Sequence, residues 1–341
     1  MNKEGENAKM KVVVLKEADI REVFTMDDAI QASKDALEIY SKGGSNIPLR
    51  TNLDVPKEEG QSLYMTGYAA EANALGVKIV SVYPNNIEKG IPSVPATMVL
   101  INEATGEVCS MMDGTYLTRV RTGAVAGAAT DLLAKKDAAI FALFGTGGQA
   151  EGQLEAVLTV RDIKEVRVFD VSQERAQAFA DEMAKQFKDK FDAKFVVAKT
   201  ADEATRNADI ISSATTSTRP TFNGKLVKKG AHINGVGSYQ PSMQEIDEYT
   251  ILNAGKVYVD TRDGVLNESG DLIIPIKAGK CTEDIVTGEL GDIILGKSPA
   301  RENNEEITFF KSVGSAVLDI VTARRIYEKA VEKEVGQIIE F

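Results

Sequence analysis

The sequence contains few of the residue types on which many active sites depend. It has one histidine, His232, two cysteines, Cys109 and Cys281, and no tryptophan among its 341 residues. A single histidine excludes histidine-rich metal sites, and a Ser-His-Asp triad would have to use His232. Two cysteines so far apart form neither a disulfide framework nor a metal cluster. We therefore expect no metal centre.

Positive charge is also scarce. The 40 lysines and arginines are outnumbered by 51 acidic residues, which gives a formal net charge of -11. This balance gives no electrostatic reason to bind nucleic acid or an anionic membrane. The first residues, MNKEGENAKMK, lack the apolar core of a signal peptide, and no later run is long enough to span a membrane. We expect a globular, cytoplasmic protein of about two domains, with no nucleic-acid or membrane partner.

A glycine-rich turn follows an apolar run at residues 138–145. The run, AAIFALFG, is typical of a strand buried on both faces of a parallel sheet. The turn GTGGQA then has the pattern G-x-G-x-x-A, in which the glycines allow a tight turn and close approach of a pyrophosphate. Alone this motif is weak, because structural turns share it. It predicts that a dinucleotide binds at the start of the next helix, to Gly145, Thr146, Gly147, Gly148, Gln149 and Ala150.

The residues that follow strengthen this prediction. A second strand, EVRVFD, ends in Asp170, near the offset of about 20 residues expected for the acid that binds the ribose. Further strands are predicted at AKFVVA, DIISSATTS, GAHINGVG and KVYVD, and Thr200 is predicted to cap the helix TADEATRNA. This alternation indicates a right-handed βαβ sheet, and hence a Rossmann domain. Four residues at its strand ends are expected near the nicotinamide and its ribose: Thr215, Thr216, Val236 and Gly237.

Asp170 also bears on the choice of cofactor. A carboxylate at this position accepts a hydrogen bond from the ribose 2′-hydroxyl and repels a 2′-phosphate. No arginine directly follows it, and Arg175 lies further on, in the expected next helix. The sequence therefore favours NAD over NADP.

Cations in the first 121 residues suggest an anionic substrate. Lys78 shares a strand face with Val80 and Val82, so it is either a guard lysine on an edge strand or a ligand-binding cation in a pocket. Arg119 and Arg121 stand on a helix predicted over 113–134, where they point about 200° apart, so only one can face a given site. Together with Arg50, such cations would suit a carboxylate substrate.

Six segments follow one another as in a known family: GVKIVSVYPNN, MMDGTYLTRVRTGA, GTGGQA, GAHINGVGSYQP, ELGDIILGK and FFKSVGSAVLD. From about residue 10 to 330 the chain resembles the ornithine cyclodeaminase/mu-crystallin family. The resemblance implies a homodimeric, NAD(P)-dependent α/β protein that acts on small amino, imino or 2-oxo acids. Residues 1–122 and 311–341 would form an α+β domain for substrate binding and dimerisation, and residues 123–310 the Rossmann domain.

The same resemblance implies roles for particular residues. Arg50, Lys78 and Arg121 would hold the substrate carboxylate, which selects Arg121 over Arg119, and Lys78 would also be catalytic. Ser93 and Ser312 would lie beside the nicotinamide.

One departure separates this chain from the cyclodeaminases of that family. Those enzymes carry an aspartate as acid/base after the strand GAHINGVG, and here the matching position is Tyr239. A phenol, with its usual pKa near 10, is a poor substitute for a carboxylate base at neutral pH. The sequence therefore favours an oxidoreductase that moves hydride between nicotinamide and C2 of the substrate. The alternatives are an ornithine cyclodeaminase that recycles NAD internally and a cofactor-loaded binding protein with negligible turnover. His232, in mid-strand, is expected to be structural.

Overall fold

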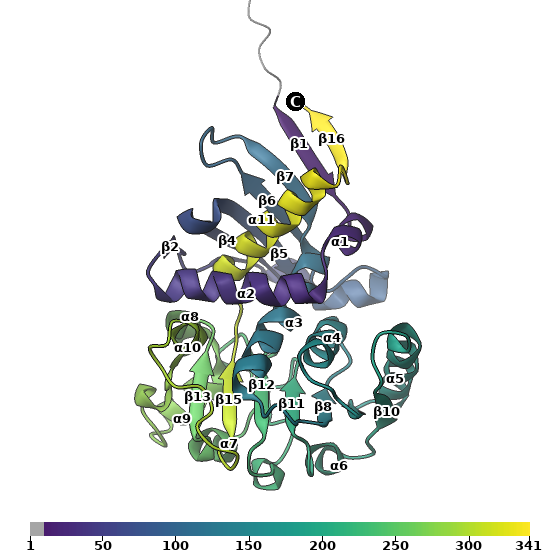
Figure 1. The fold of residues 1–341 in the computed structure, drawn as a ribbon, viewed down its shortest axis with the longest axis vertical. Coiled ribbons are helices and arrows are strands. Elements are labelled where there is room, and N and C mark those ends of the chain that lie inside the picture. Colours follow the sequence, from purple (N-terminus) through teal and green to yellow (C-terminus); the bar gives the residue numbers. More distant parts are fainter. Residues whose placement is uncertain (1–9) are drawn as a thin grey trace, which may run out of the picture. The chain divides into compact units, whose positions relative to one another are not determined.

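The computed structural model describes residues 10–341, which form two compact units. The first unit is Met1–Thr25, from residue 10 onwards, with Gly43–Thr118 and Ala316–Phe341. The second is Met26–Lys42 with Arg119–Ser315. Helix α3 (Gly114–Leu133) carries the chain from the first unit into the second (Figure 1).

The second unit is built on a parallel sheet of eight strands in the order β10-β9-β8-β11-β12-β15-β13-β14. The chain order reverses between β8 and β11, which is the switch point at which doubly wound sheets bind ligands. The strands are β8 (Ile140–Phe144), β9 (Glu165–Phe169), β10 (Lys194–Val197), β11 (Ile210–Ser213), β12 (His232–Gly235), β13 (Lys256–Val259), β14 (Gly288–Glu289) and β15 (Thr308–Lys311).

Both faces of this sheet are buried, which explains why its strands read as continuous apolar runs. Phe141 and Leu143 of β8 pack with α4 and α5 in one core. Ala142 and Phe144 of the same strand belong to a second core with residues of α6 to α9. The helices of this unit are α2 (Met26–Ser41), α4 (Ala150–Val160), α5 (Gln173–Phe187), α6 (Ala201–Thr205), α7 (Glu248–Asn253), α8 (Arg262–Glu268), α9 (Gly270–Lys277) and α10 (Leu290–Ile294), with 3-10 turns η4 (Gly224–Leu226) and η5 (Glu283–Ile285).

The first unit has one mixed sheet in the order β16-β1-β7-β6-β5-β4-β2, with β3 paired to β4. Helix α11 (Ala316–Glu332) packs across β4, β5 and β6 (Figure 1). The other elements are β1 (Lys11–Leu15), α1 (Glu17–Val23), β2 (Ser45–Asn46), β3 (Thr51–Val55), η1 (Pro56–Glu58), β4 (Gly60–Ala69), η2 (Ala70–Ala72), β5 (Ala74–Val82), η3 (Pro84–Lys89), β6 (Ala96–Ile101), β7 (Val108–Asp113) and β16 (Gln337–Glu340).

The predicted α/β class with a Rossmann unit is confirmed. All six strands predicted for that unit are present. The helix predicted over TADEATRNA is present as the shorter α6 (Ala201–Thr205), and its N-cap is Thr200, whose side chain accepts a hydrogen bond from the Glu203 amide at 3.1 Å. Strand β15 was not predicted, nor was its insertion between β12 and β13. Its last residue, Lys311, and the next residue, Ser312, therefore join the edge of the sheet that carries the nucleotide motif.

Candidate active site

The glycine loop between β8 and α4 has the geometry of a phosphate-binding turn. Gly145 has φ +92, and a Cβ atom there would lie 2.8 Å from Cγ2 of Thr215, so the position requires glycine. A Cβ atom at Gly147 or Gly148 would meet nothing within 4 Å, which leaves the backbone open to a ligand. Helix α4 follows with no side-chain cap from Gln149, and an uncapped helix N-terminus is a common binding site for phosphate groups. These features fit a dinucleotide pyrophosphate.

Asp170 follows β9 directly and lies beside this loop. Its Oδ2 accepts from the Thr146 amide at 3.0 Å and hydroxyl at 2.8 Å, and its Oδ1 accepts from the Ser172 amide at 3.0 Å. Burial raises the pKa of Asp170, but these hydrogen bonds and the charge of Arg175 outweigh it, so the pKa is lowered. The carboxyl group is therefore ionised at neutral pH and able to accept from a ribose hydroxyl.

No arginine directly follows Asp170 in the sequence, yet the structure brings Arg175 into contact with it. Nη2 of Arg175 lies 3.2 Å from Oδ2 of Asp170, and 63% of the Arg175 side chain is exposed. The helix that begins at Gln173 brings the guanidinium back over the acid. The repulsion that Asp170 exerts on a 2′-phosphate is thus partly offset.

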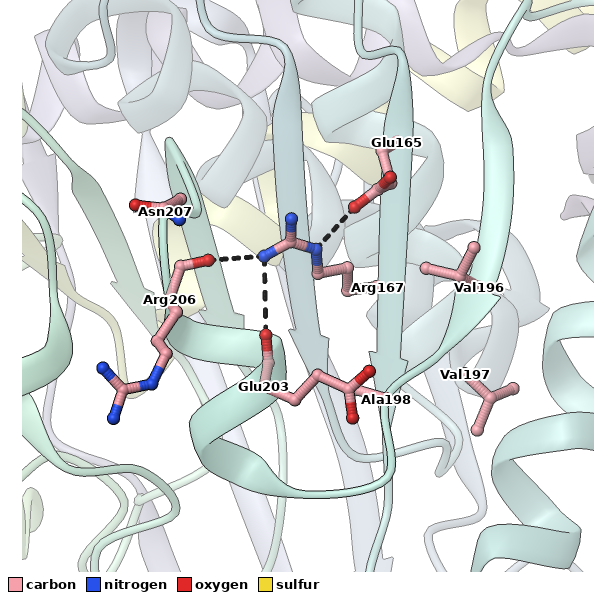
Figure 2. A pocket seen from close by; sticks show the side chains of 8 residues that line it. All are labelled: Glu165, Arg167, Val196, Val197, Ala198, Glu203, Arg206 and Asn207. Carbon is pink, nitrogen blue, oxygen red and sulfur yellow. Dashed lines mark hydrogen bonds and ion pairs between the residues drawn. The ribbon is translucent and has the colours of Figure 1, made fainter.

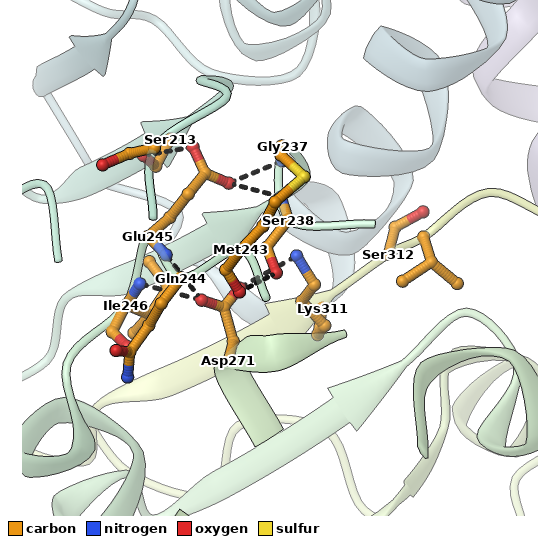
Figure 3. Close-up of polar contacts among 12 residues, drawn as sticks. Ser213, Gly237, Ser238, Met243, Gln244, Glu245, Ile246, Asp271, Lys311 and Ser312 are labelled. Atoms are coloured by element: carbon orange, nitrogen blue, oxygen red, sulfur yellow. Dashed lines mark hydrogen bonds and ion pairs between the residues drawn. The ribbon is translucent and has the colours of Figure 1, made fainter. Parts of the chain in front are cut away.

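The ends of β11 and β12 carry the residues predicted to face the nicotinamide. Thr215 and Gly237 are in close contact, since a Cβ atom at Gly237 would lie 2.1 Å from the Thr215 carbonyl oxygen. Val236 is buried, and Thr216 is exposed. Thr215 donates its backbone N–H group to the carboxylate of Glu245 at 2.6 Å. Gly237 donates its own N–H group to the same carboxylate, also at 2.6 Å (Figure 3). Sequence reasoning missed Glu245, which stands in an irregular segment with no characteristic spacing.

Ser312 lies at the end of β15, where its hydroxyl donates to Asp260 at 2.6 Å. The Gly314 amide donates to the same oxygen of Asp260 at 2.9 Å. Burial raises the pKa of Asp260, while these donors and the charge of Arg121 oppose the rise. Gly314 has φ +77, and a Cβ atom there would lie 2.4 Å from Nη1 of Arg121. Ser312, Asp260, Gly314 and Arg121 thus form one buried group within the second unit.

Lys78 lies in the first unit on the face of β5 that α11 covers. Its Nζ atom is 2.7 Å from Oδ1 of Asp319, and the two side chains are 1% and 0% exposed. Met65 and Met98 are its partners on the neighbouring strands. Because β5 lies between β4 and β6, the interpretation of Lys78 as an edge-strand guard is wrong. Asp319 was missed, although an acid within the apolar stripe of α11 is a signal that could have found it.

The remaining residues singled out in the sequence are Arg50, Ser93, Arg119, Arg121 and His232, and they do not form one cluster. Arg50 precedes β3 and Ser93 lies between η3 and β6, both partly buried in the first unit. Arg119 pairs with Glu151 of α4 at 2.8 Å, and Arg121 is only 6% exposed. His232 is fully buried between Thr308 and Asn234, at 2.9 and 3.0 Å, and burial lowers its pKa to about 3. It is a neutral structural histidine, as predicted.

A separate pocket lies where β9, β10 and α6 meet (Figure 2). Its central cation, Arg167, is held by the Glu165 carboxylate at 2.6 Å and by the carbonyl groups of Glu203 and Arg206. The guanidinium is therefore already engaged by the protein, and we assign the pocket no part in the site. Within residues 10–341, no cluster of His, Cys, Asp and Glu could hold a metal ion, and no helix is long and apolar enough to cross a membrane.

Comparison with known proteins gives one consistent result. The sequence profile of the ornithine cyclodeaminase/mu-crystallin family matches residues 10–334. The chain is 40% identical over 330 residues to a Delta(1)-pyrroline-2-carboxylate reductase of Bacillus cereus, covering 97% of this chain and 100% of the relative.

Two solved structures extend this similarity. The Thermococcus litoralis Delta(1)-pyrroline-2-carboxylate reductase, in complex with NADH and L-proline, has 42% identity and a TM-score of 0.90, over 96% of this chain and 99% of that one. An archaeal alanine dehydrogenase dimer with bound NAD has 33% identity and a TM-score of 0.88, over 97% of this chain and 100% of that one.

Proposed function

The chain belongs to the ornithine cyclodeaminase/mu-crystallin family, and we propose that it is an NADH-dependent reductase of a five-membered cyclic imino acid. The reaction class, NAD(P)-dependent reduction or oxidation at C2 of a small amino, imino or 2-oxo acid, follows from the family. The cyclic substrate is suggested by the two pyrroline-2-carboxylate reductases, which are 40% and 42% identical to this chain. The observation that carries the proposed protonation step is the buried ion pair of Lys78 and Asp319.

The second unit supplies the cofactor residues. The loop 145–150 would bind the pyrophosphate, and Asp170 would bind the adenosine ribose. When bound, the nicotinamide supplies the hydride that reduces C2 of the substrate. Thr215, Thr216, Val236, Gly237 and Ser312, together with Ser93 of the first unit, are the proposed contacts of its other half.

Lys78, Arg50 and Arg121 are the proposed substrate residues. Each offers charged N–H donors, which bind a carboxylate more strongly than neutral donors do. Reduction of an imine adds one hydride to C2 and one proton to nitrogen, and the Lys78 ammonium is the proposed source of that proton. Asp319 would hold the Lys78 side chain in place, since its Oδ1 atom accepts a hydrogen bond from Nζ of Lys78 at 2.7 Å. Replacing the cyclodeaminase aspartate by Tyr239 leaves the competing lyase reaction without its carboxylate.

A substrate panel tests this proposal. The protein is incubated with NADH and Δ1-pyrroline-2-carboxylate, the six-membered Δ1-piperideine-2-carboxylate, or pyruvate with ammonium, and absorbance at about 340 nm is followed. L-Ornithine with NAD⁺ is assayed in parallel for ammonia. We expect NADH consumption to be fastest with the five-membered ring. Ammonia release from ornithine without net NADH would instead establish the cyclodeaminase, and faster turnover of pyruvate would establish an alanine dehydrogenase.

We also propose that the protein is a homodimer, formed through the face of the first sheet opposite α11. Val14, Val77, Val99 and Met111 lie side by side across four strands of that face. Met111 is 38% exposed, which is unusual for a large apolar residue in mid-strand. The archaeal alanine dehydrogenase is described as a dimer, which supports the proposal. The cytoplasmic location stays a prediction from the sequence.

Sedimentation equilibrium tests the assembly. The wild-type protein should have twice the mass of the chain, and Met111→Lys should have the mass of one chain. Leu252→Lys, at a residue 39% exposed in the second unit, is the matched control and should remain dimeric. A monomeric wild type, or a Met111→Lys variant that stays dimeric, would contradict this assignment.

A further inference from the structure

Glu245 is completely buried, yet its carboxylate joins two separate loops (Figure 3). Its Oε1 accepts from the Ser213 hydroxyl at 2.8 Å, and from the Thr215 amide and hydroxyl at 2.6 and 2.8 Å. Its Oε2 accepts from the amides of Gly237 and Ser238 at 2.6 and 3.0 Å. One side chain therefore satisfies donors that follow β11 and donors that follow β12.

These two loops lie at the edge of the sheet where a ligand is expected. Strand β11 is the neighbour of β8, and both end at the switch point. Thr215 also touches the glycine loop, because its Cγ2 lies 2.8 Å from the position of a Cβ atom on Gly145. The segment fixed by Glu245 thus borders the loop that has the geometry for a pyrophosphate, while that loop is held separately by the hydrogen bonds of Thr146 to Asp170.

Glu245 is itself held by a buried ion pair between Asp271 and Lys311. Oδ1 of Asp271 accepts from the backbone amides of Glu245 and Ile246 at 2.7 and 3.0 Å. Oδ2 of Asp271 lies 2.9 Å from Nζ of Lys311, the last residue of β15, and both side chains are 0% exposed. Burial raises the pKa of Glu245, and the charge of Lys311 opposes this rise.

Burying three charged groups is expensive, and apolar residues of similar size often give equal or greater stability. A cluster that served stability alone would therefore gain little from its charges. The carboxylates of this cluster instead accept hydrogen bonds from five backbone N–H groups, three of which belong to residues 215, 237 and 238. Such an arrangement fits a demand for precise loop geometry.

We propose that Glu245 is a positioning residue for the nicotinamide half of the cofactor. It locks the Thr215 and Gly237 loops into one surface, while the adenosine half depends on the glycine loop and Asp170. This inference rests on the proposed function, because it assumes that a nicotinamide dinucleotide binds at this edge. It predicts that a change at Glu245 affects the two halves of the cofactor differently.

Binding of NADH and of ADP-ribose, which lacks the nicotinamide, tests this directly by isothermal titration calorimetry. Glu245→Gln keeps the size of the side chain but places an NH₂ donor against backbone N–H donors. We expect its Kd for NADH to rise at least tenfold and its Kd for ADP-ribose to change less than threefold. Glu203→Gln is the control. It alters a carboxylate within α6 that accepts a hydrogen bond from the Lys199 amide at 2.8 Å, and it should change neither Kd.

Ser213→Ala provides a second, milder variant in case Glu245→Gln does not fold. It removes the hydroxyl group within β11 that donates to Glu245. The Kd for NADH should rise a few-fold, and the Kd for ADP-ribose should not change. Equal weakening of both ligands in these variants would show that Glu245 only maintains the fold, and unchanged NADH affinity would also overturn the inference. A wild-type protein that binds neither ligand would instead refute the proposed function itself.

Discussion

The buried pair of Lys78 and Asp319 leads to a prediction in which stability can be restored by a second substitution but turnover cannot. Lys78→Met leaves the Asp319 carboxylate buried without the ammonium 2.7 Å away, and Asp319→Leu leaves the ammonium without that carboxylate. Removing one member of a buried pair typically costs about 3–5 kcal/mol of unfolding free energy. Each single variant should therefore be markedly less stable than the wild type.

The double variant Lys78→Met with Asp319→Leu should recover most of this loss. Its two apolar side chains would lie beside Met65 and Met98, which are 3% and 0% exposed. Replacement of a buried ion pair by apolar residues is often neutral or stabilising by about 1–4 kcal/mol. Urea denaturation of the four proteins measures this recovery.

Turnover should not recover with stability. Loss of a proton donor typically lowers kcat about 10²-fold or more, so the double variant should be as slow as Lys78→Met. Lys78→Arg should also remain slow, because a guanidinium does not give up its proton. The Kd for NADH should change little, since the glycine loop belongs to the second unit. Near-wild-type kcat in the stable double variant would show that Lys78 is structural, and stability losses that simply add would show that the two groups do not act as a pair.

Three further predictions concern the second unit. Asp170→Asn should raise the Kd for NADH at least about tenfold, because it removes a charge-assisted hydrogen bond. Arg175→Ala should raise the Kd for NADPH more than the Kd for NADH. A wild type that binds NADPH as tightly as NADH would contradict this account. Arg121→Ala should lower kcat/KM by about 30-fold or more, whereas Arg119→Ala, whose pair with Glu151 is part-exposed, should change it less than about fivefold. Burial lowers the pKa of His232 to about 3 in the folded protein, below the unfolded value near 6.5. The stability that neutral His232 contributes is therefore complete above pH 6.5 and is lost as the pH falls. The free energy of unfolding should decrease by up to about 1.4 kcal/mol per pH unit from this cause. His232→Gln should remove that part of the slope in urea denaturation between pH 6.5 and 4.5, and unchanged slopes would refute it.

The parts of the site that could be predicted from sequence are those encoded locally. The glycine turn, the strand before it and Asp170 lie within about thirty residues, and each has its own spacing or hydrophobic pattern. Thr200 was recognised as an N-cap for the same reason. A residue that acts within its own segment can be found from that segment alone.

The parts that were missed depend on contacts between distant segments. Asp319 meets Lys78 across 241 residues, and no spacing rule links an acid on one helix to a lysine on one strand. Glu245 stands in irregular structure, and its role appears only once β11 and β12 are neighbours. The membership of α2 in the second unit likewise follows from its packing on α10, where a Cβ atom at Gly291 would lie 2.2 Å from the Leu37 carbonyl oxygen. Strand order and helix docking are global properties, so they leave no local signal.

The measurement that most directly tests the central claim is the transfer of hydrogen from the cofactor to the substrate carbon. The protein is incubated with Δ1-pyrroline-2-carboxylate and NADH labelled with deuterium at C4 of the nicotinamide, using each stereoisomer of the label separately. Mass spectrometry and NMR of the proline formed then locate the label. We expect one of the two stereoisomers to give proline that carries one deuterium at C2. Formation of no proline, or of proline without deuterium from either stereoisomer, would contradict the assignment of this protein as an NADH-dependent imino-acid reductase.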